Sequence, residues 1–214
     1  MDYADARRRM VDGQLRPNKV TDPGLLAAVR GLPRELFLPL PLRPRAYSDE
    51  DVPLPGGRAL MEPMVLARLV QLLEARPGCR ALVVGAGTGY GAAVLARMGA
   101  SVTAVEEDAA LAAAAREAFA ACLPPAAIRL ADRLPDWEER FDAVLIEGAV
   151  PAVPPEFAER VAEGGRLSTV QGNGGRNGVA VVGRRIGGAF TVSPVFDCAV
   201  AALPAFAEPA RFVF

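Results

Sequence analysis

The chain has 214 residues, of which 51% are hydrophobic and 23% are charged, and its formal net charge is −1. A chain of this length can bury one substantial core, so we expect a single domain over residues 1–214. The balanced charge gives no electrostatic case for binding nucleic acid or a membrane surface, and no apolar run reaches the roughly 18 residues that a membrane span requires.

The sequence contains no histidine, and its three cysteines lie far apart. These two facts exclude a Ser–His or Cys–His nucleophile pair and an imidazole metal site, and we expect no metal. Any chemistry must come from a bound cofactor, carboxylates, hydroxyls, lysine or arginine, or the backbone. The cysteines suit reduced thiols and the charged N-terminus carries no secretion signal, so we expect a cytoplasmic protein.

The first 76 residues predict helices joined by irregular chain. Residues 5–14 are expected to be helical, and Thr21-Asp-Pro-Gly24 is expected to cap a helix over residues 25–30. Residues 39–63 are rich in proline, which regular elements tolerate poorly, so we expect an irregular arm laid over the domain. Its Leu, Tyr and Met side chains favour packing over a flexible linker. A helix is expected over residues 64–75.

From residue 77 onward, apolar strands and helices alternate, which predicts a doubly wound, Rossmann-like, mostly parallel α/β sheet. We expect the cofactor-binding core over residues 77–170. The expected strands lie near residues 81–84, 102–105, 127–130, 142–147 and 166–170, and the expected helices near 90–99, 109–121 and 155–162. Over residues 171–214 no helix separates the expected strands, at 178–184, 190–196 and 210–214, so we expect an antiparallel C-terminal edge.

The most informative stretch is a glycine-rich turn after the first strand of this core. Gly85, Gly87 and Gly89 allow the chain to turn sharply into a helix and leave its backbone open to a ligand. Glu106 stands at the end of the next strand, about 20 residues after the first glycine, where an acid accepts hydrogen bonds from both hydroxyls of a ribose. The pattern therefore predicts a site for a nucleoside cofactor.

The spacing of the glycines distinguishes between cofactors. A dinucleotide fingerprint places its third glycine at the position that Tyr90 occupies here. The alternation of Gly85, Gly87 and Gly89 instead resembles motif I of the class I S-adenosylmethionine methyltransferases, whose ligand carries no phosphate. A nicotinamide oxidoreductase is therefore the weakest alternative.

Several segments, in their order along the chain, resemble the protein-L-isoaspartate O-methyltransferase family. They are Met10-Val-Asp-Gly-Gln-Leu15, residues 22–29, 33–39, 46–49 and 53–55, the glycine turn with Glu106, Phe141-Asp-Ala-Val-Leu-Ile146 and Gly164-Gly-Arg-Leu167. The resemblance covers about residues 10–170, and its N-terminal part is the specific one. It implies an S-adenosyl-L-methionine-dependent enzyme that methylates the carboxylate of isoaspartyl residues in damaged proteins. The sequence leaves the oligomeric state open, with a monomer favoured.

The resemblance places the cofactor along the glycine turn and the strand ends near it. The expected cofactor-binding residues are Gly85, Ala86, Gly87, Gly89, Tyr90, Glu106, Asp132 and Glu147. The family pattern implies that Glu106 holds the ribose and Asp132 the adenine amino group; a solvated loop carboxylate is the alternative for Asp132. Val83 stands where many methyltransferases have an acid, and Glu147 is either its substitute or a plain surface carboxylate.

The largest departure from the family lies at Arg58-Ala-Leu-Met-Glu-Pro63, where the family reads close to Gln-Thr-Ile-Ser-Gln-Pro. Met61 replaces the serine of the active centre, so no catalytic residue is assigned. We expect Met61, Glu62 and Pro63 to line the substrate pocket. The acceptor stays open between an isoaspartyl protein or peptide and a small molecule. A cofactor-binding protein without isoaspartate activity is a further alternative, because Val83 and the missing serine both favour it.

Overall fold

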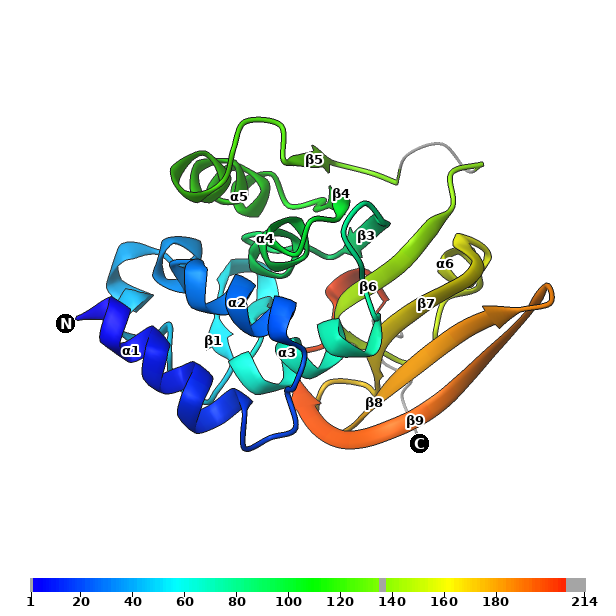
Figure 1. The fold of residues 1–214 in the computed structure, drawn as a ribbon, viewed down its shortest axis with the longest axis horizontal. Helices are drawn as coiled ribbons and strands as arrows, with labels where there is room; N and C mark the ends of the chain where they lie inside the picture. The colour runs from blue at the N-terminus through cyan, green and yellow to red at the C-terminus, as the bar shows by residue number, and fades with distance from the viewer. Residues whose placement is uncertain (1, 135–137, 207–214) are drawn as a thin grey trace, which may run out of the picture.

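The computed structural model of the chain describes residues 2–134 and 138–206. Its centre is a seven-stranded sheet in the order β5-β4-β3-β6-β7-β8-β9 (Figure 1). The strands are β3 (Arg80–Val84), β4 (Ser101–Val105), β5 (Ile128–Ala131), β6 (Phe141–Val150), β7 (Val161–Gln171), β8 (Gly175–Ile186) and β9 (Ala189–Val200). All pairings from β5 to β7 are parallel, and β7–β8 and β8–β9 are antiparallel. The predicted parallel sheet with an antiparallel C-terminal edge is confirmed, and the strand expected at 210–214 lies outside the described residues.

The helices follow the sequence signals closely. They are α1 (Tyr3–Met10), which continues as the π-helical turn η1 (Val11–Leu15), α2 (Pro23–Gly31), α3 (Pro63–Leu72), α4 (Tyr90–Arg97), α5 (Ala109–Cys122) and α6 (Pro155–Glu159). Asp22 caps α2 as expected, since its carboxylate accepts a hydrogen bond from the Leu25 amide at 2.7 Å. The helix expected to reach residue 162 is shorter, because Val161 already pairs with Phe141 in the sheet. In the described ranges no helix has the length and apolar character to cross a membrane.

The two faces of the sheet bury different sets of side chains, as parallel strands with helices on both sides require. In β3, Ala81 and Val83 face the larger core cluster, which includes side chains of α2, α3 and α4. Leu82 and Val84 point the other way, into a second cluster with side chains of α6 and of the C-terminal segment. In Figure 1 the N-terminal helices gather beside α3 and α4, on the first of these faces.

The arm over residues 39–63 packs against the domain through buried side chains such as Tyr47, Leu54 and Leu60. It is also more regular than expected. After η2 (Arg34–Phe37) it contains η3 (Leu40–Arg45), β1 (Val52–Pro53), η4 (Pro55–Gly57) and β2 (Ala59–Leu60), and β1 and β2 pair antiparallel. The fully buried Arg34 ties the arm to the core: its Nε donates to the Ala46 carbonyl at 2.7 Å and its Nη2 to the Met61 carbonyl at 2.5 Å.

Candidate functional site

The glycine turn lies where β3 passes into α4. Gly85 has a φ of 66° and Gly89 a φ of 93°, in the left-handed region that side chains other than glycine rarely adopt. A Cβ at Gly89 would also clash with the Phe119 ring of α5. The Ala86 amide donates to the Val105 carbonyl at 3.0 Å, which ties the turn to the end of β4. The turn is therefore held at the carboxyl edge of the sheet, where such folds bind ligands.

Glu106 follows β4 and lies directly beside the glycine turn, as its spacing predicted. The residue is 2% exposed. Its Oε2 accepts a hydrogen bond from the Gly87 amide at 2.6 Å, and its Oε1 accepts one from the Asp108 amide at 3.0 Å. Two backbone donors thus fix the orientation of the carboxylate before any ligand is considered.

Arg58 of the arm reaches across this turn, a contact that sequence reasoning did not anticipate. Its Nη1 lies 3.0 Å from both carboxylate oxygens of Glu106, and its Nη2 donates to the Gly85 carbonyl at 2.6 Å. The Arg58 side chain is 11% exposed. The available signal was that Arg58, a cation, replaces an uncharged residue of the family five positions before helix α3 begins at Pro63.

Met61 and Glu147 lie next to this ion pair. Both are buried, and together with Arg58, Gly148 and Leu203 they line a cavity of only about 10 Å³. Burial raises the pKa of Glu147 to about 8, against the opposing charges of nearby arginines, Arg58 first among them. Glu147 Oε2 makes no hydrogen bond of good geometry, although the Gly91 amide lies near enough to oppose the shift.

The other two residues expected in the substrate pocket lie at the start of α3. Pro63 is the first residue of that helix and is buried, and Glu62 precedes it and is half-buried. The Glu62 amide donates to Asp51 Oδ1 at 2.8 Å. Burial, with smaller contributions from the charges of Asp49 and Asp51, raises the pKa of the Glu62 carboxyl to about 7. Their contact with a substrate stays a prediction.

Tyr90 directly follows the glycine turn, and Asp132 directly follows β5. Tyr90 is buried in the first core cluster, with its ring 5.2 Å from that of Phe37 and with the Arg34 guanidinium carbon 4.6 Å from its centroid. Asp132 is exposed in the loop after β5, next to Ala131, whose carbonyl accepts from the Glu106 amide at 3.0 Å. The structure brings the Asp132 loop beside Glu106 and places Tyr90 in the packing against the N-terminal segment. Their roles in cofactor binding stay predictions.

Leu203 also approaches the glycine turn, from the C-terminal segment. A Cβ at Gly85 would lie 2.7 Å from Leu203 Cδ2, and one at Gly148 would lie 2.5 Å from Leu203 Cγ. Between Glu106, Gly85 and residues 203–206 a cavity of about 70 Å³ remains, whereas pockets for ligands of cofactor size hold roughly 300–1,000 Å³. The polar groups of the turn suit a ribose. In this arrangement, however, the side chains of Arg58 and Leu203 occupy the space beside the turn.

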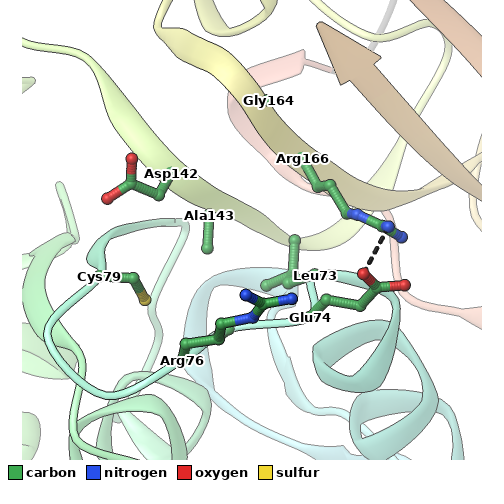
Figure 2. Close-up of a pocket in the computed structure, with 9 residues that line it drawn as sticks. Leu73, Glu74, Arg76, Cys79, Asp142, Ala143, Gly164 and Arg166 are labelled. Carbon is green, nitrogen blue, oxygen red and sulfur yellow. Dashed lines mark ion pairs between the residues drawn. The ribbon is translucent and has the colours of Figure 1, made fainter. Parts of the chain in front are cut away.

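A hollow of about 480 Å³ lies at the other edge of the sheet (Figure 2). Cys79 just before β3, Asp142 near the start of β6 and the ion pair of Glu74 with Arg166, 2.5 Å apart, surround it. Doubly wound sheets bind their ligands at the carboxyl ends of the strands, and this hollow is at the opposite ends. The glycine turn therefore remains the candidate functional site.

A mostly parallel sheet whose central strand leads into a glycine turn, and whose neighbouring strand ends in a buried acid, is the arrangement of folds that bind nucleoside cofactors. The spacing of Gly85, Gly87 and Gly89, with Tyr90 in place of the third glycine of a dinucleotide fingerprint, assigns this chain to the Rossmann-like S-adenosylmethionine-dependent methyltransferases. Within this class, the family model "Protein-L-isoaspartate(D-aspartate) O-methyltransferase (PCMT)" matches residues 6–202. The chain belongs to the protein-L-isoaspartate O-methyltransferase family.

Relatives agree with this assignment over most of the chain. A protein-L-isoaspartate O-methyltransferase of Methylorubrum extorquens (strain PA1) is 42% identical over 168 residues, covering 78% of this chain and 74% of the relative. One of Koribacter versatilis (strain Ellin345) is 34% identical over 193 residues, covering 86% and 85%. The fold matches a crystal structure of a Plasmodium falciparum protein described as a protein-L-isoaspartate O-methyltransferase, with a TM-score of 0.77 and 18% identity over 92% of this chain and 97% of that one.

Proposed function

We propose that this protein transfers the methyl group of S-adenosylmethionine to the free α-carboxylate of isoaspartyl residues in proteins. The observation that carries the proposal is the position of Glu106: the acid is buried and fixed by two backbone amides beside the glycine turn. Family membership over residues 6–202 supports the acceptor. The Plasmodium falciparum structure contains S-adenosyl-L-homocysteine, the demethylated product, which supports the cofactor.

The cofactor supplies a methyl group already activated on a sulfonium, so a carboxylate acceptor needs positioning more than acid–base help. In the transfer, the bond from the methyl carbon to the carboxylate oxygen forms as the carbon–sulfur bond breaks. The chain contributes a rigid frame for this step. Arg34 holds the Met61 carbonyl, and the buried side chains of Leu60 and Met61 fill space beside the site that water would otherwise occupy.

A second candidate acceptor is a neutral hydroxyl or amine, and the surroundings of Met61 favour it. A thioether donates no hydrogen bond that could hold a carboxylate. Two carboxyl groups lie near it, the buried Glu147 and the half-buried Asp51, and in their ionised forms both would oppose an anionic acceptor. Glu147, whose pKa burial raises to about 8, is placed to take the proton that a neutral acceptor loses on methylation.

Radiolabelled methyl transfer from S-adenosylmethionine to an isoaspartyl peptide, beside its aspartyl twin, tests the proposed function. Label on the isoaspartyl peptide alone is the expected result. Equal labelling of both peptides, or no labelling of either by a protein that binds S-adenosylhomocysteine, would contradict the isoaspartyl acceptor. In the second case, labelling of hydroxyl- or amine-bearing compounds would support the neutral acceptor.

A further inference from the structure

We propose that Arg58 is a gate on the cofactor site: its ion pair with Glu106 closes the site, and the cofactor binds when Arg58 moves from Glu106 to Glu147. This inference rests on the proposed cofactor and goes beyond it, because it assigns the control of cofactor affinity to residues of the arm and of β6. The gate consists of Arg58, its partner in the closed arrangement, Glu106, and its partner in the open arrangement, Glu147.

The closed arrangement uses every acceptor position of Glu106. A carboxylate offers about four lone-pair positions. Arg58 Nη1 takes one on each oxygen, and the amides of Gly87 and Asp108 take one more on each. The Gly87 amide belongs to the glycine turn and the Asp108 amide to the N-cap of α5, so neither can leave without disrupting its element. The two hydroxyls of a ribose would therefore need the positions that Arg58 holds, so cofactor and arginine compete for the same carboxylate.

Glu147 is the partner that the structure provides for a displaced Arg58. Both residues line the same small cavity, and the charge of Arg58 is the largest favourable influence on ionised Glu147. Glu147 is 8% exposed, and its Oε2 lacks a good hydrogen bond. A buried carboxyl without partners is costly, and an arriving guanidinium would remove that cost. Asp51 lines the cavity as well, but each of its oxygens already accepts a backbone amide, from Glu62 and from Ala201, whereas Glu147 Oε2 accepts none of good geometry.

Leu203 narrows the cavity beside the glycine turn independently of the ion pair. Its backbone is fixed, because its amide donates to the Ala149 carbonyl at 2.9 Å and the Ala149 amide donates to the Ala201 carbonyl at 2.9 Å. The side chain is thereby pressed against Gly85 and Gly148. Shortening this side chain opens space at the glycine turn without touching Arg58.

The test is calorimetric titration of S-adenosylhomocysteine into the full chain, four single variants and one double variant. Arg58→Gln should bind about tenfold tighter or more, because the competing charge is gone, a factor that corresponds to about 1.4 kcal/mol. Leu203→Ala should also bind more tightly. Arg45→Gln is the matched control: Arg45 belongs to the same arm and pairs with Glu50 at the surface, 2.9 Å away, so its loss should leave the affinity unchanged.

Glu147→Gln separates the gate from a direct contact with the cofactor. This variant should bind about tenfold more weakly, since Arg58 loses its second partner, and the effect should vanish in the Arg58→Gln background. A loss of affinity that persists in that background would show that Glu147 touches the cofactor instead. Either that result, or unchanged or weaker binding by Arg58→Gln, would overturn the gate while leaving the cofactor assignment intact. If no folded variant binds S-adenosylhomocysteine, the cofactor and the gate are both rejected.

Discussion

The guanidinium of Arg58 and the carboxylate of Glu106, 48 positions apart in the chain, meet at 3.0 Å beside the glycine turn. The sequence spacing predicts that Glu106 binds the ribose of the cofactor, whereas in the structure Glu106 forms an ion pair with Arg58 of the arm. Both assignments hold if the ion pair is one of two arrangements of the same site. The affinity for the cofactor is then the difference between binding the ribose and breaking this pair.

Replacing Glu106 by alanine should lower the affinity for S-adenosylhomocysteine at least tenfold. The variant loses the acceptor of two ribose hydroxyls, and each hydrogen bond to a charged group contributes about 1.5–3 kcal/mol. Calorimetric titration measures the change, with the exposed Glu117→Ala on α5 as the control. Unchanged affinity in Glu106→Ala would remove Glu106 from the site.

The Met61→Ser variant should gain isoaspartate methylation relative to the native chain. A serine hydroxyl can donate a hydrogen bond to a carboxylate acceptor, and the smaller side chain enlarges the cavity beside Glu147. Initial rates on an isoaspartyl peptide measure the gain, and Met98→Ser, at the end of α4, controls for the general loss of a methionine. Robust methylation by the native chain, equal to that of Met61→Ser, would show that the serine is not needed here.

Stability should fall with rising pH because of Glu147. Burial raises the pKa of Glu147 from its ordinary 4.5 to about 8, so the folded chain holds a proton that the unfolded chain releases between these values. The stabilisation is complete below about pH 4.5 and is lost as the pH rises toward 8. Glu147→Gln stays neutral, so its melting temperature relative to the native chain should rise by several degrees between pH 5 and pH 8. For the control Glu117→Gln, the difference in melting temperature from the native chain should not change with pH. If the difference for Glu147→Gln is also independent of pH, the Glu147 carboxyl is not buried in the folded state.

Asp51 joins two segments that cover the site, and its removal should loosen both. One carboxylate oxygen accepts from the Glu62 amide at 2.8 Å and the other from the Ala201 amide at 3.1 Å. Asp51→Ala leaves both donors without this partner, at a cost of about 1–3 kcal/mol for each donor that stays buried. For a chain of this size, a few kcal/mol lowers the melting temperature by roughly 5–10 °C. Asp49→Ala, at an exposed position two residues away, should leave it unchanged, and an equal effect of both variants would argue against a linking role for Asp51.

The sequence by itself determined the strand–turn–helix–strand unit from β3 to Glu106. The signals there are local: an apolar run long enough for a buried strand, glycines where the turn needs positive φ, and an acid at the end of the next strand. Side-chain alternation and helix caps act over a few residues, so they predict these elements from the sequence alone. The family resemblance came from the same kind of evidence, because its motifs are short segments in a set order.

Only the tertiary structure decided what fills the site. Arg58 and Leu203 reach the glycine turn from the arm and from the C-terminal segment. Whether they do so depends on the path of both segments, which Asp51 and the backbone of Ala149 set through hydrogen bonds over long sequence separations. Such contacts leave no periodic pattern in the sequence. A single arginine or leucine gives the same local signal whether its side chain faces solvent or packs at the site. The spacing of Glu106 therefore predicted an acid at the site, while burial and competing partners decided which group that acid holds.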